Sequence, residues 1–197
     1  MVQQPPAHSH RERLLEALAA CIRDRGLRAT QIADIVRAAH TSRRTFYECF
    51  PDKESCFVEL VREATTHLLG AIEASIDPEA PWQVQVDQAL GTYLAALSED
   101  PAVTATISRE LPALGLRGAA VQRENIERYA GLVVRIAGST RMRGAGVRQV
   151  SVETAVMLVG GLNELVIHAI DHGQPLSGVA TVAGDVLKAV LAPGSGR

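Results

Sequence analysis

Apolar residues recur every three or four positions along most of the chain, which is the spacing of one face of an α-helix. The first such stripe consists of Leu14, Leu15, Leu18 and Ile22. It predicts a helix that begins at His10 and ends at Gly26, because glycine commonly terminates helices. No stretch alternates strictly between apolar and polar residues, as a half-buried strand would. The pattern therefore predicts an all-α protein with about nine helices.

Two short helices are predicted to follow the first one. Thr30 is a favourable N-cap for a helix over residues 31–39, and Ser42 is one for a helix that reaches Phe50, because hydroxyl oxygens accept hydrogen bonds from the first helical turn. A tight turn joins the two helices. A long helix then begins at Asp52, whose carboxylate suits a helix N-terminus.

The long helix is predicted to end at residue 76, before two prolines. The remaining predicted helices cover residues 82–99, 101–111, 119–138, 150–171 and 177–191. Residues 138–147, rich in glycine and arginine, are expected to form a mobile loop.

The composition is that of an ordinary globular protein. Of 197 residues, 47% are hydrophobic and 21% are charged, which excludes a disordered chain, a collagen-like repeat and a disulfide scaffold. In the apolar C-terminal segment, the longest charge-free part is residues 154–163, whereas a membrane-spanning helix needs roughly 20 apolar residues. The N-terminus lacks the apolar core of a signal peptide, so we expect a cytoplasmic protein without a membrane partner. The three cysteines are expected to be free thiols.

Charge is distributed unevenly along the chain. Residues 1–57 contain nine Arg and Lys against seven Asp and Glu, whereas residues 58–197 contain eleven against fifteen. The N-terminal quarter is therefore mildly basic and the rest is acidic. This asymmetry is compatible with nucleic-acid binding by the N-terminal quarter alone.

Two short helices that follow a longer one and are joined by a tight turn are the components of a helix-turn-helix DNA-binding unit. In the second short helix, Phe46 and Phe50 are four residues apart and are expected to face the core. The opposite arc carries Arg43, Arg44, Thr45 and Tyr47. Arginine can bind guanine through two hydrogen bonds and threonine can contact thymine, while tyrosine hydroxyls commonly bind phosphate. Lys53, in the first turn of the next helix, can also pair with phosphate.

The residues of these helices form a specific signature. The run Thr-Phe-Tyr-x-x-Phe-x-x-Lys-Glu occupies residues 45–54. From residue 12 to residue 57, the sequence resembles the DNA-binding domain of the TetR family of transcriptional regulators. The resemblance implies a helix-turn-helix domain over residues 10–51, after a flexible arm over residues 1–9. It also implies a helical ligand-binding and dimerisation domain over residues 52–197.

Members of this family are homodimers that usually repress transcription and release double-stranded DNA when a small molecule binds. The resemblance therefore implies a repressor that binds a roughly palindromic operator, and not an enzyme. Carried over residue by residue, it implies phosphate contacts by Thr30, Ser42, Tyr47 and Lys53. It implies base contacts by Arg43, Arg44 and Thr45.

The sequence departs from the family at two positions. His40 stands in the turn where the family usually has glycine, and glycine adopts positive φ more readily than histidine. A histidine there can strain the turn or add a phosphate contact. Cys49 stands where a histidine or an aromatic residue is common, so one contact to the DNA backbone can be missing.

The C-terminal part has no motif of comparable strength. Residues 150–171 are apolar nearly all round, which indicates burial on more than one face. Gly160 and Gly161 would let a second helix approach closely, which favours a dimer interface over the core helix of a monomer. The aliphatic composition favours a small, mostly apolar effector with a few polar anchors. The candidate ligand-binding residues are His67, Trp82, Tyr93, Arg109, Tyr129, Met157, Asn163, Glu164 and His168.

Three other functions stay open, although no metal site and no cofactor are assigned. His168, Asp171 and His172 share a helical face and could sense a metal ion, or form an ordinary helix end. Cys49 and Cys56 could sense oxidants, although they lack CxxC spacing. A metal-assisted hydrolase at the two histidines is the enzymatic alternative, but no catalytic motif accompanies it.

Overall fold

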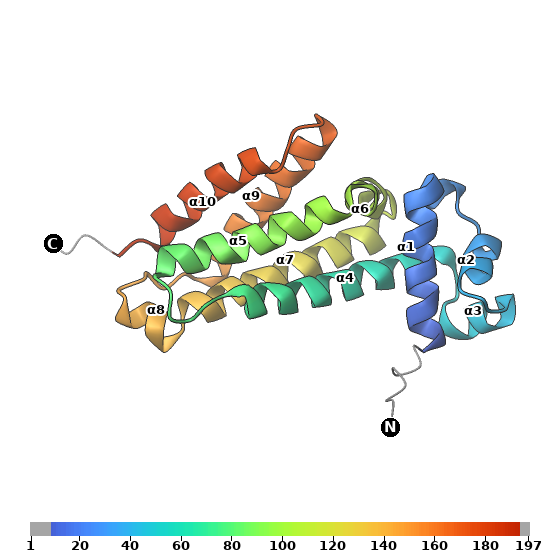
Figure 1. Cartoon of the computed structure of the whole chain (residues 1–197), viewed down its shortest axis with the longest axis horizontal. Helices are drawn as coiled ribbons and strands as arrows, with labels where there is room; N and C mark the ends of the chain where they lie inside the picture. The colour runs from blue at the N-terminus through green and yellow to red at the C-terminus, as the bar shows by residue number, and fades with distance from the viewer. Residues whose placement is uncertain (1–8, 194–197) are drawn as a thin grey trace, which may run out of the picture. The chain divides into compact units, whose positions relative to one another are not determined.

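Ten α-helices and no strand make up the described part of the chain, residues 9–193 of the computed structural model (Figure 1). The helices are α1 (His10–Ala29), α2 (Ile32–Ala38), α3 (Arg43–Cys49), α4 (Lys53–Ser75), α5 (Trp82–Glu99), α6 (Pro101–Ala113), α7 (Leu116–Ala137), α8 (Thr140–Gly144), α9 (Val152–Asp171) and α10 (Ser177–Leu191). The all-α prediction is confirmed. Apart from Ser9, the arm predicted over residues 1–9 lies outside the described residues.

The chain forms two compact units. Of the described residues, unit 1 contains those up to Ala64 together with Ala102–Val121, and unit 2 contains Thr65–Pro101 and those from Gln122 onward. Helices α4 and α7 therefore each contribute residues to both units.

Helix α1 begins with a capping box. The Ser9 hydroxyl oxygen accepts a hydrogen bond from the Glu12 N–H at 3.2 Å, and the Glu12 carboxylate accepts one from the Ser9 N–H at 2.7 Å. These bonds satisfy backbone donors that lack partners within the helix. Gly26, with a φ of 78°, interrupts the helix where the sequence predicted its end, and one further turn runs to Ala29.

The N-cap of α2 is Gln31, and the prediction of Thr30 was wrong. The Asp34 carboxylate accepts a hydrogen bond from the Gln31 N–H at 3.0 Å. The Thr30 hydroxyl instead donates to the Gly26 carbonyl oxygen at 2.7 Å. Thr30 therefore stabilises the end of α1 rather than the start of α2.

Helices α3 and α4 have the predicted caps. The Ser42 hydroxyl oxygen accepts a hydrogen bond from the Thr45 N–H at 3.1 Å. An Asp52 carboxylate oxygen accepts one from the Ser55 N–H at 2.5 Å. Hydrogen bonds from Ser55 lower the pKa of Asp52, so the carboxylate stays charged at the helix N-terminus.

The turn between α2 and α3 is a Schellman motif with His40 in the left-handed conformation, at a φ of 50°. The His40 N–H donates to the Arg37 carbonyl at 3.2 Å, and the Thr41 N–H donates to the Val36 carbonyl at 2.9 Å. This is the hydrogen-bond pattern in which glycine is usual. His40 is the one non-glycine residue with positive φ among residues 9–193.

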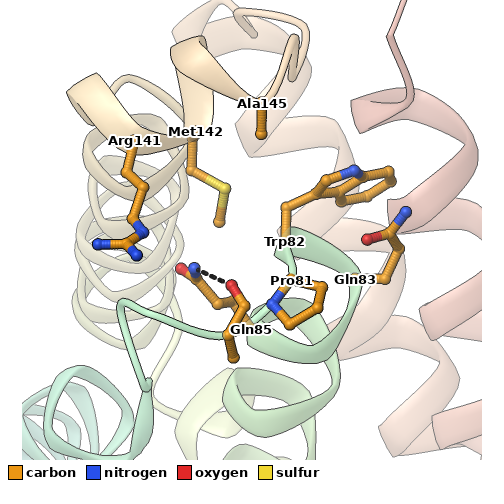
Figure 2. Close-up of a pocket in the computed structure, with 8 residues that line it drawn as sticks. Pro81, Trp82, Gln83, Gln85, Arg141, Met142 and Ala145 are labelled. Atoms are coloured by element: carbon orange, nitrogen blue, oxygen red, sulfur yellow. Dashed lines mark hydrogen bonds between the residues drawn. The ribbon is translucent and has the colours of Figure 1, made fainter.

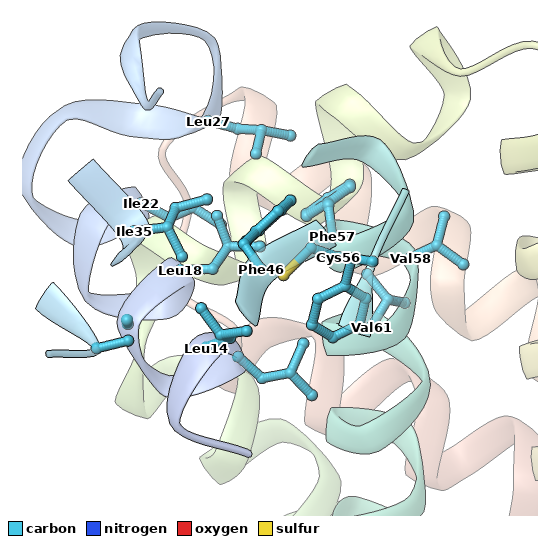
Figure 3. Packing of buried hydrophobic residues seen from close by; sticks show 14 of the residues in the cluster. Leu14, Leu18, Ile22, Leu27, Ile35, Phe46, Cys56, Phe57, Val58 and Val61 are labelled. Atoms are coloured by element: carbon cyan, nitrogen blue, oxygen red, sulfur yellow. The ribbon is translucent and has the colours of Figure 1, made fainter. Parts of the chain in front are cut away.

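The core of unit 1 joins the first four helices (Figure 3). Phe46 of α3 and Phe57 of α4 are fully buried, as are Leu14 and Leu18 of α1 and Ile35 of α2. Each helix of the predicted helix-turn-helix domain thus contributes its apolar face to one core, as its sequence spacing indicates.

Helix α6 and the first turn of α7 also belong to unit 1. Leu111 and Val121 are buried in the same core as Phe46. On the surface, Arg28 Nε donates to the Glu110 carboxylate at 2.8 Å, within unit 1. Helix α6 continues past its predicted end at residue 111, because a proline in the last turn removes only one backbone donor.

Unit 2 contains an apolar cluster from α5, α9 and α10, with Leu90, Leu94, Val166 and Val179 among its buried residues. Along the two helices shared with unit 1, arginines bind partners 62 positions earlier in the chain. The pairs on these helices in unit 2 are Arg128 with Thr66 and Arg135 with Glu73; beyond the two helices, Arg141 of α8 pairs with Glu79 at the same separation. The constant separation means that α4 and α7 run parallel within this unit.

The loop predicted over residues 138–147 contains a helix, α8, so the prediction was wrong for residues 140–144. The Ser139 hydroxyl oxygen accepts a hydrogen bond from the Met142 N–H at 3.3 Å, and Met142 is buried. A helix of five residues is too short to show a period in the sequence, so only the cap could have indicated it.

Helix α9 is long and apolar enough to cross a membrane by length and composition, with a mean hydropathy of 1.3 over its most apolar window. The sequence predicted no membrane-spanning helix here, because the longest charge-free part of this segment is only residues 154–163. Only 17% of that window is buried within the chain. Helix α9 therefore presents an uncovered apolar face, with Glu153 and Glu164 also exposed on it.

We expect Gly118→Ala to destabilise the protein by about 2 kcal/mol or more, because the new methyl group overpacks a buried site. A Cβ at Gly118 would lie 1.7 Å from the Leu111 carbonyl oxygen. The matched control is Gly131→Ala on the same helix, where a Cβ meets nothing within 4 Å; it should be neutral or stabilising by up to about 1 kcal/mol. Urea unfolding compares the two, and equal stabilities would contradict the packing described.

We expect His40→Gly to stabilise the protein by roughly 0.5–1 kcal/mol. Left-handed backbone costs a non-glycine residue about 1–2 kcal/mol, and the greater entropy of glycine in the unfolded chain offsets part of the gain. The same change at Ala38, the last residue of α2, should be destabilising by up to about 1 kcal/mol. Thermal unfolding measures both variants, and a loss of stability in His40→Gly would mean that the imidazole contributes more than the turn costs.

Candidate nucleic-acid interface

Helix α3 has one apolar face in the core and one polar face in solvent. Phe46 is fully buried and Phe50 is nearly so, whereas Arg43, Arg44 and Tyr47 are exposed. The Tyr47 ring packs edge-on against Phe46, with ring centroids 5.6 Å apart. The side chains predicted to contact DNA are thus carried together on the outside of a helix that the core orients.

Arg44 has a carboxylate neighbour on its own helix. Its Nε donates to a Glu48 carboxylate oxygen at 3.0 Å, and both side chains are well exposed. Exposed pairs of this kind contribute little to stability, because water screens them and ordering two long side chains costs entropy. Arg44 can therefore exchange Glu48 for another acceptor at small cost.

The hydroxyl groups predicted to contact phosphate differ in accessibility. The Ser42 hydroxyl is exposed and lies 2.9 Å from the Thr45 hydroxyl, so the two share a hydrogen bond at the start of α3. The Tyr47 side chain is also exposed. Thr30 is buried, and its hydroxyl already donates to the Gly26 carbonyl.

Lys53 has a structural role that sequence reasoning missed. Its ammonium group donates to the carbonyl oxygens of Leu27 and Thr30, at 2.8 Å each. Carbonyls at a helix C-terminus carry partial negative charge and lack partners within the helix, so a cation is favourable there. Lys53 thereby joins the first turn of α4 to the end of α1, and one of its three protons remains for a further acceptor.

The cysteines of unit 1 are free thiols. Cys56 is fully buried, and burial raises its pKa to about 12. Burial also raises the pKa of Cys21. Because the thiolate is the reactive form, both are poor candidates for oxidation. Cys49 is half-buried at the end of α3.

Unit 2 contains an aliphatic cavity of about 90 Å³. Its lining residues are Ile72, Ala89, Leu90, Tyr93, Tyr129, Leu132, Val133, Ile136, Val159, Leu162 and Leu187. Two of the candidate ligand-binding residues, Tyr93 and Tyr129, meet here edge to face with ring centroids 5.6 Å apart. The sequence did not indicate the aliphatic lining, because an aliphatic residue beside a cavity has the same spacing as one in the core. Only polar and aromatic residues on apolar helices were recognisable as candidates.

The other candidate ligand residues do not line this cavity. His67, Met157, Glu164 and His168 are exposed, and Asn163 is half-buried. Arg109 is exposed and belongs to unit 1.

A second, more polar cavity of about 350 Å³ lies beside α8 in unit 2 (Figure 2). Trp82, Met142 and Arg141 line it, together with Gln85, whose amide donates to the Ala80 carbonyl at 2.9 Å. The guanidinium of Arg141 is already paired with the Glu79 carboxylate. Trp82 is thus separated from the tyrosine pair.

The histidines near the end of α9 form a helix terminus. Their rings stack with centroids 4.1 Å apart, and His172 Nδ1 lies 2.8 Å from the His168 carbonyl oxygen. Within residues 9–193, no three His, Cys, Asp or Glu side chains are grouped as metal ligands would be.

Comparison with known proteins agrees with these features. Residues 14–60 match the family described as bacterial regulatory proteins, tetR family. Among curated proteins, none matches the chain.

Three similar solved structures illustrate the fold. The regulator FadR from Bacillus subtilis, in complex with stearoyl-CoA, has a TM-score of 0.73 and 18% identity, over 91% of this chain and 98% of its own. The fatty acid degradation regulator FadR from Bacillus halodurans has a TM-score of 0.69 and 18% identity, over 99% and 100%. A regulatory protein of the tetR family from Rhodococcus RHA1 has a TM-score of 0.61 and 16% identity, over 96% and 100%.

The N-terminal match covers the three helices whose outward face carries the arginines, and the fold of nearly the whole chain is that of solved regulators. Residues 14–60 are therefore a helix-turn-helix DNA-binding domain of the TetR family.

Proposed function

We propose that the protein is a homodimeric repressor that binds a roughly palindromic operator and releases it when a small, mostly apolar effector binds. The observation that carries the proposal is the outward face of α3, where two arginines and a tyrosine are exposed on a helix anchored by Phe46. A DNA-binding regulator acts where the chromosome lies, so we place it in the cytoplasm. We assign it no catalytic role, since such a protein acts by binding.

Each α3 of the dimer enters a major groove, with half-site centres about 34–36 Å apart or slightly more. Arg43, Arg44 and Thr45 read base edges, the arginines through guanine. Ser42 and Tyr47 bind phosphate through exposed hydroxyls.

The remaining predicted contacts lie around this helix. His40 is exposed in the turn before it and is a further phosphate contact. The Lys53 ammonium group has three N–H donors, and two of them are bound to carbonyl oxygens. The third donates a hydrogen bond to phosphate. Thr30 acts through its main chain, because its hydroxyl is engaged with Gly26.

The dimer forms through α9 and α10. Among residues 9–193, eight large apolar side chains are exposed, and five of them lie on these helices: Val152, Met157, Leu165, Val182 and Val186. A Cβ at Gly160 or Gly161 would meet nothing within 4 Å, so the protomer itself leaves these glycines open to a close-packing helix. A second copy covering this face accounts for the apolar character of α9 without a membrane.

The effector binds in the aliphatic cavity of unit 2. A cavity of about 90 Å³ is smaller than one of about 150 Å³ that accepts benzene, so a larger ligand must widen it. Helices α4 and α7 line the cavity and also contribute to unit 1. Effector binding therefore favours a conformation with displaced α4 and α7, and lowers DNA affinity through that preference. The similar FadR fold with stearoyl-CoA supports an apolar chain as ligand.

Arg43→Ala and Arg44→Ala should each weaken operator binding by about 1–3 kcal/mol, roughly five- to 150-fold, and relax specificity at one base position. The control is Arg143→Ala, an exposed arginine on α8 in unit 2, which should bind normally. Fluorescence anisotropy with the operator and with single-base variants measures this. Equal weakening for every DNA sequence would instead assign the arginine to phosphate.

Met157→Glu should convert the dimer to a monomer, because it places a charge on the apolar face of α9, where Met157 is 65% exposed. Light scattering should report twice 21.0 kDa for the unmodified protein and a single chain mass for the variant. Leu116→Glu, at an exposed apolar residue of α7, is the control and should remain dimeric. A monomeric unmodified protein would contradict the proposed assembly.

A further inference from the structure

Glu48 is an acidic residue on the outward face of α3, whereas the DNA contacts proposed on this helix are arginines and hydroxyl groups. Each residue turns a helix by about 100°, so Arg44 and Glu48, each two residues from the buried Phe46, lie within about 20° of the direction opposite to it. Thr45 and Tyr47, each one residue from Phe46, lie to the two sides. Arg44 and Glu48 therefore point most directly away from the core of unit 1.

An exposed carboxylate at this place is unfavourable for DNA binding in general. Backbone phosphates are negatively charged and offer only acceptors, so Glu48 cannot bind them and is repelled by them. In the free protein, the Glu48 carboxylate accepts a hydrogen bond from Arg44 Nε at 3.0 Å. When Arg44 turns to guanine, as proposed above, that donor is lost. The carboxylate then needs a new donor within the groove, because a charged group that loses water without gaining a partner is costly.

The major groove offers two such donors, the exocyclic amino groups of cytosine and adenine. The N6 amino group of adenine lies between two acceptors, its own N7 and O4 of the paired thymine, and both repel a carboxylate. The N4 amino group of cytosine has one acceptor beside it, O6 of the paired guanine, and a C–H group on the other side. A carboxylate is therefore better matched to cytosine than to adenine.

We propose that Glu48 is a base-reading residue whose carboxylate accepts a hydrogen bond from N4 of a cytosine next to the guanine that Arg44 contacts. The charged groups of the two side chains lie 3.0 Å apart, close to the rise of about 3.4 Å between successive base pairs, so the two bases belong to neighbouring pairs. Glu48 also disfavours DNA that lacks the amino group at this position, which increases the preference for the operator over other sequences. This assignment rests on the proposed function, in which α3 enters the major groove, and adds a second reader of opposite charge.

Selection from random DNA tests the assignment. The full-length protein and its Glu48→Gln variant each retain duplexes with a randomised central stretch at physiological salt, and the retained duplexes are sequenced. The unmodified protein should enrich cytosine at one position of each half-site. Glutamine has a similar shape but pairs with N6 and N7 of adenine, so the variant should enrich adenine there and keep the neighbouring guanine. An unchanged site in Glu48→Gln overturns the assignment.

Glu48→Ala separates base reading from simple repulsion. The variant removes both the acceptor and the charge, so its preference for the selected site over an unrelated duplex should fall about fivefold or more. The matched control is Glu54→Gln, which removes an exposed carboxylate from the first turn of α4 in the same unit and should leave the preference unchanged. Both positions are exposed, so both variants should fold, which thermal unfolding checks. An equal fall in the two variants means that Glu48 acts by charge alone and overturns the assignment.

The selection also separates this inference from the proposed function. If the unmodified protein enriches a site that Glu48→Gln leaves unchanged, base reading by Glu48 is contradicted while sequence-specific binding by the protein is supported. If the unmodified protein enriches no site, the proposed operator binding is contradicted, and the assignment to Glu48 with it.

Discussion

The burial of Phe46 is the constraint on which the DNA-binding surface depends. Helix α3 has seven residues, too few for a stable helix in isolation. It is held by Phe46 in the core of unit 1 and by the Ser42 cap. Because one face is fixed in this way, the side chains on the opposite face have a defined direction, and a surface of arginine, tyrosine and hydroxyl groups becomes a recognition surface.

The same core also links α3 to parts of the chain far away in sequence. Leu111 and Val121 pack into it, and Lys53 joins the start of α4 to the end of α1. Helices α4 and α7 then continue into the unit that contains the aliphatic cavity. A ligand that displaces these helices therefore acts on elements that already support the DNA-binding face. The coupling that we propose needs no separate relay, because packed helices shift as units.

How much the sequence could predict depended on whether a signal was local. The stripe at Leu14 and the Ser42 cap are local, and both were confirmed. Contacts between distant residues were not accessible: neither the carbonyl partners of Lys53 nor the place of α6 in unit 1 has a signature in spacing. In the cavity, Tyr93 and Tyr129 stood out as polar groups on apolar helices, whereas Leu132 looked like any core residue.

Capture of genomic fragments at physiological salt tests the central claim most directly. The protein is incubated with sheared DNA from its source organism, and the retained fragments are sequenced, with an Arg43→Ala, Arg44→Ala double variant in parallel. The account predicts enrichment of fragments that share a roughly palindromic site, and loss of that enrichment in the double variant. Uniform retention of all fragments, or the same enriched site with the double variant, would contradict sequence reading by α3.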